Sequence, residues 1–270
     1  NPFDYARRWW MRAILAISVL FLYFPIVALI AFSFNNSKRN INWRGFTLKY
    51  YEKAFANEAL HDAFINSMIV ASISTLVSTV LGAMLGILLY RFRFPLKGAY
   101  EGMVHLPIVI PEVCMGVALL AFFAANKMPL GLTTITVSHI AFTIPFVAVV
   151  IRARMAGFDR SLEEAACDLG AGQWQVMRDI TLPYLKPGLI AGAMLAFTLS
   201  LDDFVITFFT SGPGSTTFPI KIYSMVRFSV TPEVNAASTL LIVLTLGLTV
   251  VAMWVQSRGD GGAGARKDGA

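Results

Sequence analysis

Six long apolar stretches, separated by segments that carry arginine and lysine, constrain the fold of this chain most. A helix needs about 20 apolar residues to cross the hydrocarbon core of a membrane. The chain is 56% hydrophobic and 14% charged, against roughly 45–50% and 25% in soluble domains. The sequence therefore predicts an all-α polytopic membrane protein, folded as one domain over residues 1–270 with six transmembrane helices. The predicted spans are 11–34, 64–90, 99–125, 132–151, 187–210 and 238–255.

The distribution of basic residues predicts the orientation. With the N-terminus inside, fourteen of the 22 lysines and arginines fall in cytoplasmic segments, including the dense pairs around Arg91 and Arg152. Three basic residues between 38 and 44 oppose this, but they are fewer. Since cytoplasmic loops are enriched in Lys and Arg, both termini are predicted inside. The run 13–34 is too long for a signal-peptide core and is interpreted as the first anchor. The net charge of +6 is attributed to topology and anionic lipid, not to nucleic acid.

The cytoplasmic loop 152–186 has a helical pattern of its own. Ser161 and Glu164 have the spacing of a capping box, which predicts a short helix over 162–169. Gly170 is predicted to stop that helix. A second helix is predicted over 173–180, ended by Pro183. The tail 259–270 is Gly-rich and charged, which predicts disorder.

The loop contains Glu164-Ala165-Ala166, then Gly170, then Ile180-Thr181-Leu182-Pro183. This pattern resembles the E-A-A-x(3)-G-x(9)-I-x-L-P loop of binding-protein-dependent ABC-importer permeases (MetI-like, type I), and every fixed position matches. The resemblance implies the type I permease fold and a loop that docks onto a separate ATPase subunit. The alternative is an ordinary helical hairpin between spans. The residues implied in ATPase coupling are Glu163, Glu164, Ala165, Ala166, Asp168 and Gly170.

Three carboxylates fall inside predicted spans: Glu112, Asp202 and Asp203. A charge at that depth costs about 2.5–3.5 kcal/mol on insertion scales, so it normally faces a cavity or a partner. If both helices are straight, Glu112 and Asp202 lie at similar depth, roughly 20–22 Å from the cytoplasmic ends. A cavity with acids and no basic residue favours a cation. The alternative is that an acid is held as architecture by a neighbouring hydroxyl or helix end. No metal site is predicted, because the three histidines are isolated.

Nearly the whole chain also resembles the polyamine (spermidine/putrescine) permeases of this family. The resembling segments are Asn42-Trp43-x-Gly45-Phe46, Pro111-Glu112, the segment 199–203 and the segment 221–227. The resemblance implies a permease for putrescine or spermidine, without separating the two. The implied substrate-contact residues are Trp43, Glu112, Ser200, Asp202 and Asp203. Trp43 either stacks on an ammonium or belongs to the interfacial aromatic belt.

No G-x-x-x-x-G-K-[ST] motif occurs, so the chain has no loop to cradle the phosphates of ATP. We therefore expect a transport subunit and not an enzyme, with no cofactor of its own and with ATP–Mg²⁺ on a partner. By resemblance, the complex contains a second, unlike permease, two ATPases and an external polyamine-binding protein, in a bacterial inner membrane. Two alternatives stay open: the same importer class with another amine, such as a cationic amino acid or an aminophosphonate, and an ion-coupled carrier. The carrier gives the Glu164 loop no role.

Overall fold

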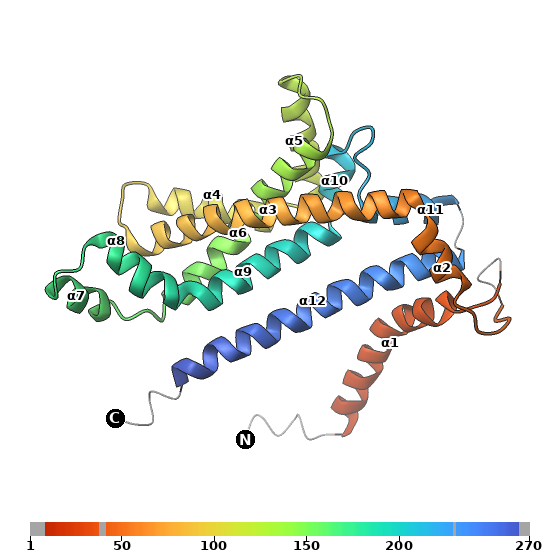
Figure 1. Cartoon of the computed structure of the whole chain (residues 1–270), viewed down its shortest axis with the longest axis horizontal. Helices are drawn as coiled ribbons and strands as arrows, with labels where there is room; N and C mark the ends of the chain where they lie inside the picture. The colour runs from red at the N-terminus through yellow and green to blue at the C-terminus, as the bar shows by residue number, and fades with distance from the viewer. Residues whose placement is uncertain (1–8, 38–41, 229–230, 265–270) are drawn as a thin grey trace. The chain divides into compact units, whose positions relative to one another are not determined.

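The computed structural model describes residues 9–37, 42–228 and 231–264, which form helices joined by short loops (Figure 1). An isolated β-bridge pairs Asn35 with Phe46. Within the described residues, five helices are long and apolar enough to cross a membrane, or six if one bent pair counts as a single span. The predicted all-α, multi-span class is confirmed. The helices are α1 Trp9–Ser33, α2 Lys49–Ala56, α3 Glu58–Arg91, α4 Lys97–Val109, α5 Glu112–Ala125, α6 Leu132–Met155, α7 Ser161–Asp168, α8 Gln173–Val176, the π-helix η2 Met177–Thr181, α9 Leu182–Asp202, α10 Val205–Thr210, α11 Phe218–Phe228 and α12 Pro232–Gly264.

The chain divides into two compact units where the sequence predicts one domain. The first comprises Asn1–His61 and Lys221–Val243, and the second Asp62–Ile220 and Leu244–Ala270. The divisions fall inside α3, α11 and α12, so no composition change marks them in the sequence. The second unit carries the loop 152–186 and all three predicted carboxylates.

The first unit is held together by polar and aromatic contacts after α1. The side chain of Asn35 is fully buried, donates to the carbonyl of Asn42 at 2.8 Å and accepts from the N–H of Arg44 at 2.8 Å. Phe34 stacks on Phe46 with ring centroids 5.2 Å apart. These contacts satisfy backbone groups between α1 and α2 and so hold the start of α2 in place.

In the second unit, α6 is the central helix, against which α3 and α9 pack through glycines. A Cβ on Gly82 of α3 would lie 2.7 Å from the Cβ of Val147, and one on Gly192 of α9 would lie 3.3 Å from Val147 Cγ1. A Cβ on Gly86 would lie 2.8 Å from the carbonyl oxygen of Ala148. The spacing Gly82-x-x-x-Gly86 in the sequence is typical of a close contact between membrane helices, and the structure shows that contact.

Substituting Gly82 with alanine should therefore destabilise the second unit. The new methyl group would also lie 2.9 Å from the Ile144 carbonyl oxygen, and overpacking of this kind costs about 1–3 kcal/mol. Gly102→Ala is the matched control, because Gly102 is also helical and has nothing within 4 Å of its Cβ position. Thermal unfolding in detergent should show a lower melting temperature for Gly82→Ala alone. Equal melting temperatures would contradict the tight contact.

The predicted third span is not a straight helix. It consists of α4 and α5, which meet at 107°. Pro111 follows Ile110, whose φ of −68° and ψ of 134° are extended, as the proline ring forces on the residue before it. The depth calculated for Glu112 from a straight helix was therefore wrong.

The predicted fifth span is also interrupted. Residue Asp202 ends α9, and α10 begins at Val205, whereas the sequence predicts one helix to Thr210. Pro183 does not end the second loop helix as predicted; α8 passes through η2 into α9, and Pro183 lies in the first turn of α9. A proline is tolerated there because its missing N–H needs no intrahelical partner.

Two further differences concern the C-terminal third. The segment between the predicted fifth and sixth spans contains α11, for which the sequence predicts no span. Helix α12 continues to Gly264, so residues 259–264 are helical where disorder was predicted, and 265–270 lie outside the described residues. Extending an existing helix costs far less than starting one, so α12 continues into a Gly-rich sequence.

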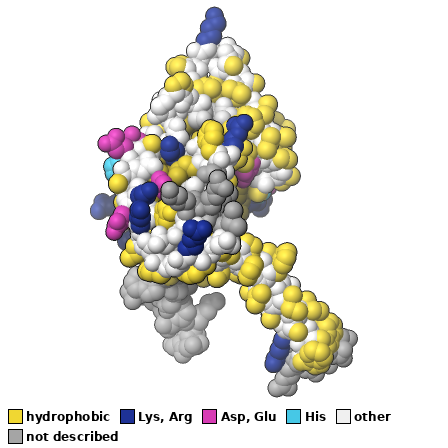
Figure 2. Space-filling model, turned by 90° about the vertical axis from the view of Figure 1, so that its right-hand side faces the viewer, with side chains coloured by type: hydrophobic (Ala, Val, Ile, Leu, Met, Phe, Trp, Pro, Cys, Tyr) yellow, Lys and Arg dark blue, Asp and Glu magenta, His cyan; other side chains and the backbone are white. Residues whose placement is uncertain are grey.

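Large apolar side chains are exposed over the surface, as expected for a protein surrounded by lipid (Figure 2). On α1, Phe21 is 77% exposed and Leu20 is 68% exposed. No part of the 18-residue window that defines this span is buried. A soluble protein rarely exposes a continuous apolar surface of this size, so the surface supports the membrane assignment.

Candidate functional site

The break between α9 and α10 separates two neighbouring aspartates. Asp202 is the last residue of α9 and is exposed, whereas Asp203 adopts an extended backbone and is only 8% exposed. Both were predicted to contact substrate. The structure gives them different surroundings: one carboxylate faces outward and the other faces the protein interior.

Asp203 holds the start of α10. Its carboxylate accepts hydrogen bonds from the N–H of Ile206 at 3.3 Å, the N–H of Thr207 at 2.8 Å and the hydroxyl of Thr207 at 2.7 Å. The first N–H groups of a helix have no intrahelical partner, and a carboxylate satisfies them and favours the helix dipole. Helix α9 ends here because the extended Asp203 binds the first N–H groups of α10 with its carboxylate, and this new helix start takes the place of a further turn of α9.

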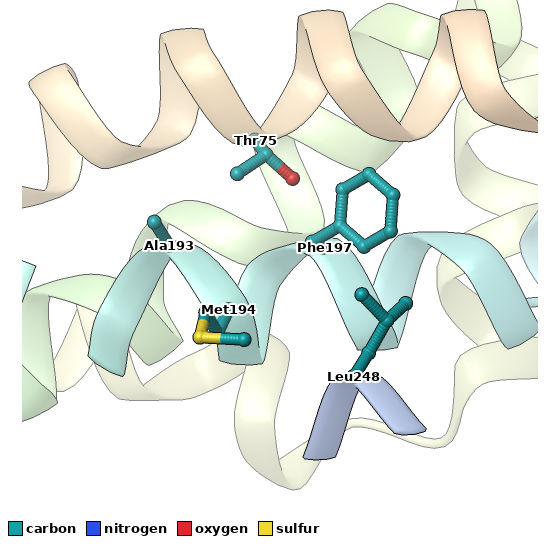
Figure 3. A pocket seen from close by; sticks show the side chains of 5 residues that line it. All are labelled: Thr75, Ala193, Met194, Phe197 and Leu248. Atoms are coloured by element: carbon teal, nitrogen blue, oxygen red, sulfur yellow. The ribbon is translucent and has the colours of Figure 1, made fainter. Parts of the chain in front are cut away.

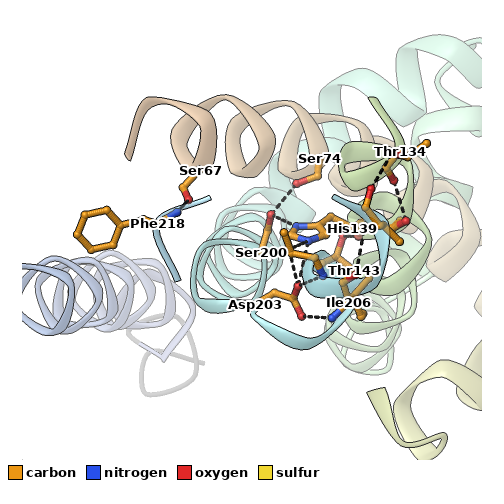
Figure 4. Close-up of polar contacts among 12 residues, drawn as sticks. Ser67, Ser74, Thr134, His139, Thr143, Ser200, Asp203, Ile206 and Phe218 are labelled. Carbon is orange, nitrogen blue, oxygen red and sulfur yellow. Dashed lines mark hydrogen bonds and ion pairs between the residues drawn. The ribbon is translucent and has the colours of Figure 1, made fainter. Parts of the chain in front are cut away.

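His139 of α6 joins this carboxylate to two other helices (Figure 4). Its Nε2 lies 3.2 Å from Asp203 Oδ2 and 2.9 Å from Thr207 Oγ1, and its Nδ1 lies 2.7 Å from Ser200 Oγ. Ser200 Oγ in turn lies 3.0 Å from Ser74 Oγ of α3. We call Ser74, His139, Ser200, Asp203 and Thr207 the buried polar network. It joins α3, α6, α9 and α10.

The buried polar network contains the residue types of a Ser–His–Asp triad. Ser200 is only 4% exposed, and its hydroxyl is shared with Ser74. A nucleophile needs a substrate atom about 3–3.5 Å away, which this packing excludes. The arrangement fixes helices and does not attack a substrate.

His139 and Thr207 are members that the sequence analysis missed. His139 is 61 residues from Ser200, and no local spacing connects them. An ionisable residue inside an apolar span normally has a partner, so the only available signal was His139 in one predicted span and Asp203 in another.

Glu112 starts α5, directly after the α4–α5 bend, and is exposed. Helix α5 packs on α10, where a Cβ on Gly116 would lie 2.6 Å from the ring of Phe209. The two exposed carboxylates thus lie beside the α5–α10 contact. Among the described residues, no group of three or more His, Cys, Asp or Glu side chains could hold a metal ion.

Trp43 belongs to the first unit and is 53% exposed. Its ring meets that of Phe32 edge-on, with centroids 6.3 Å apart. An exposed indole suits both a cation–π contact and an interfacial position.

A separate cavity of about 260 Å³ lies between α3, α9 and α12 (Figure 3). It is lined by Thr75, Ala193, Met194, Phe197 and Leu248. This lining contains no charged group, so the cavity is not where a cation would be paired.

In the loop 152–186 the short helix α7 is followed by a turn and then by α8, which is continuous with η2 and α9. The predicted first helix and its stop at Gly170 are present. Gly170 has a φ of 87°, and the N–H of Ala171 donates to the carbonyl of Ala166 at 3.0 Å. This is the pattern in which a left-handed glycine ends a helix. Within α7, the structure exposes Glu164, Ala165 and Asp168, half-buries Ala166, and buries Glu163 to 8% exposure.

The start of α7 differs from the predicted capping box. Ser161 is already the first helical residue, and its N–H donates to Asp159 Oδ1 at 2.9 Å. This hydrogen bond holds the pKa of the Asp159 carboxyl below its usual value. The N–H of Glu164, which the Ser161 hydroxyl would bind in a capping box, donates instead to the carbonyl oxygen of Arg160 at 3.2 Å.

Three large apolar side chains on the same loop are exposed, and the sequence analysis did not select them. Leu162 is 52% exposed, Leu169 is 90% exposed and Trp174 is 75% exposed. Apolar groups left exposed around a polar helix are typical of a surface that a partner protein covers.

Residues 78–260 match the family model described as "Binding-protein-dependent transport system inner membrane component". The chain is 40% identical over 245 residues to the spermidine/putrescine transport system permease protein PotC of Shigella flexneri, covering 90% of this chain and 93% of that one. It is 38% identical over 267 residues to the putrescine transport system permease protein PotI of Escherichia coli (strain K12), covering 96% and 95%. The fold is similar to that of a bacterial ABC transporter for the import of alginate, with a TM-score of 0.70 and 18% identity over 95% of this chain and 97% of that one.

Proposed function

Because the chain belongs to the inner-membrane components of binding-protein-dependent transport systems, we propose that it is the permease subunit of an ATP-driven importer for polyamines. It is a multi-pass protein of the inner membrane. The observation that carries the substrate class is the pair of exposed carboxylates, Asp202 and Glu112, beside a helix break in a membrane-spanning unit. The similarity to permeases named for spermidine and putrescine supports the same class.

The proposed substrate contacts follow from burial. An ion leaving water needs an opposite charge nearby, because an unpaired buried charge costs several kcal/mol. Asp202 and Glu112 have exposed carboxylates that could pair with ammonium groups. Trp43 is proposed separately, as an exposed indole of the first unit that could make a cation–π contact. Asp203 and Ser200 are already bonded within the buried polar network, so their role is to hold the break that exposes Asp202.

The proposed ATPase contact is α7 with the turn after it. The exposed charges of Glu164 and Asp168 and the exposed apolar groups of Leu162, Leu169 and Trp174 supply a mixed docking surface. ATP and Mg²⁺ bind the partner ATPase, and closure of the ATPase pair moves α7. We further propose a complex of this chain with a second, unlike permease, two ATPases and an external binding protein.

Reconstitution tests the function directly. Liposomes containing the chain, its second permease and the ATPases should accumulate labelled putrescine or spermidine only when ATP is inside and the external binding protein is outside. Uptake driven by a proton or sodium gradient without ATP would instead indicate an ion-coupled carrier. Preferential uptake of a cationic amino acid would support the ATP-driven importer and refute the polyamine as its substrate.

We propose that both termini lie in the cytoplasm, and cysteine labelling tests this orientation. Thr216→Cys and Gln173→Cys are made in a Cys114→Ser, Cys167→Ser background, since both native thiols are exposed. In right-side-out vesicles an impermeant maleimide should label the exposed position 216 and not 173, and in inside-out vesicles the reverse. Ser215→Cys is the matched control, because Ser215 is only 2% exposed and should react slowly in both. Labelling with the sides exchanged would overturn the orientation.

A further inference from the structure

Glu163 and Glu164 are neighbours on α7 with opposite surroundings. Glu164 is exposed, whereas Glu163 is buried. The side chain of Glu163 contacts two other elements, α3 and η2. Its Oε2 forms an ion pair with Arg91 at the end of α3. Its Oε1 accepts a hydrogen bond from the Thr181 hydroxyl of η2 at 2.5 Å. Both carboxylate oxygens are thus occupied within the chain.

The helix ends that carry Arg91 and Glu163 both favour the ion pair between them. Arg91 is the last residue of α3, where a cation stabilises the helix dipole, and Glu163 lies in the first turn of α7, where an anion does. The Glu163 side chain is 11% exposed and that of Arg91 is 30% exposed. Removing either charge would leave the other partly buried without its partner, which is strongly unfavourable.

Thr181 connects the cluster to the beginning of α9. It is fully buried at the end of η2, and its hydroxyl also lies 3.5 Å from the carbonyl oxygen of Val176, five residues earlier. Single π-turns inside helices occur frequently at functional sites. Here the π-turn joins the loop helix α8 to α9, whose far end carries Asp202.

The same two helices, α3 and α9, are also joined inside the membrane-spanning unit. Ser74 of α3 bonds Ser200 of α9 in the buried polar network, and Gly82 and Gly192 pack both helices on Val147 of α6. A displacement of α7 that is transmitted through Glu163 therefore reaches both helices that support the Asp202 break.

We propose that Glu163, with Arg91 and Thr181, is an internal positioning cluster that transmits movement of α7 to α3 and α9, and that it does not contact the ATPase. This inference rests on the proposed importer function and reassigns Glu163 from the docking surface to the interior. Glu164, one residue on, stays on the docking surface.

The test uses the complete reconstituted complex and measures two quantities: how much ATPase co-purifies with the permease, and how many substrate molecules enter per ATP hydrolysed. Glu163→Gln and Arg91→Gln should retain co-purification and lower the uptake-to-hydrolysis ratio by about tenfold, within the range of typical coupling free energies. Arg91→Lys, which keeps the charge, should retain most of the ratio. Glu164→Gln should instead lower co-purification and leave the ratio of the assembled complexes near wild type.

An unchanged ratio in both Glu163→Gln and Arg91→Gln would overturn the proposal. Loss of co-purification in Glu163→Gln with a normal ratio in the assembled fraction would also overturn it, by making Glu163 a docking residue. If these variants do not fold, Thr181→Val removes a single hydrogen bond to the same carboxylate. A normal uptake-to-hydrolysis ratio in Thr181→Val would then overturn the proposal. Failure of the proposed function is distinguishable, because the wild-type complex would then show no ATP-dependent uptake at all.

Discussion

An Asp203→Ala variant should lose about 3–5 kcal/mol of stability, because it leaves several buried hydrogen-bond donors without an acceptor, at about 1–3 kcal/mol each. The substitution would leave unsatisfied the N–H groups of Ile206 and Thr207, the Thr207 hydroxyl and the Nε2 side of His139. These groups belong to α6 and α10, so we expect loss of the helix break together with loss of packing between the two helices.

Thermal unfolding of the purified protein in detergent measures this effect. Asp202→Ala is the matched control, because Asp202 is the adjacent residue and its carboxylate is exposed. It should melt close to the wild-type temperature, while Asp203→Ala melts far below it or does not accumulate in the membrane. Equal melting temperatures for the two variants would show that the buried polar network contributes little to the fold.

An Asp202→Asn variant should fold normally and lose about 100-fold in uptake rate. A hydrogen bond to a charged group contributes about 1.5–3 kcal/mol. Each 1.4 kcal/mol corresponds to about a tenfold change in an equilibrium or rate constant. Asparagine keeps the size of the side chain and removes the charge, so packing at the end of α9 is preserved. Transport of labelled polyamine into liposomes measures the effect, with binding of the same polyamine to the external binding protein expected to stay unchanged.

Glu112→Gln should reduce uptake as well, because Glu112 is the second exposed acid beside the α5–α10 contact. Asp62→Asn is a suitable control, since Asp62 is an exposed acid at the start of α3. Full uptake by the Asp202→Asn, Glu112→Gln double variant would refute the cation site. This pair is more informative than a double aspartate variant, in which misfolding from Asp203 would mask any transport defect.

The sequence was sufficient wherever a property depends on one segment. The length of an apolar run decides whether a helix crosses the membrane, and each helix that could cross the membrane overlaps one of the predicted apolar runs. Gly170 could be predicted as a helix stop because the left-handed φ it adopts is costly for residues with a Cβ. The small residues Gly82 and Gly86 likewise marked a close helix contact before its partner, α6, was known.

Local patterns failed at the places where a remote group competes with the helix. Hydropathy predicted unbroken helices through Pro111 and Asp203, since apolar content does not register a bend of 107° or a two-residue break. At Asp203, three hydrogen bonds to α10 outweigh continuation of α9. The Ser161 capping box failed for a local reason: Ser161 is already helical, and the N–H of Glu164 donates to the Arg160 carbonyl.

The candidate site divides in the same way. The sequence by itself determined that carboxylates enter the membrane-spanning region and that a loop with Glu163 and Glu164 follows the fourth span. Only the tertiary structure decided which residue of the pairs Asp202–Asp203 and Glu163–Glu164 has an exposed carboxylate. Asp203 is buried because His139 comes from another helix, 61 residues before Ser200, and Glu163 is buried because Arg91 is 72 residues away. Adjacent residues with identical chemistry have identical local preferences, so only partners brought by distant parts of the chain distinguish them.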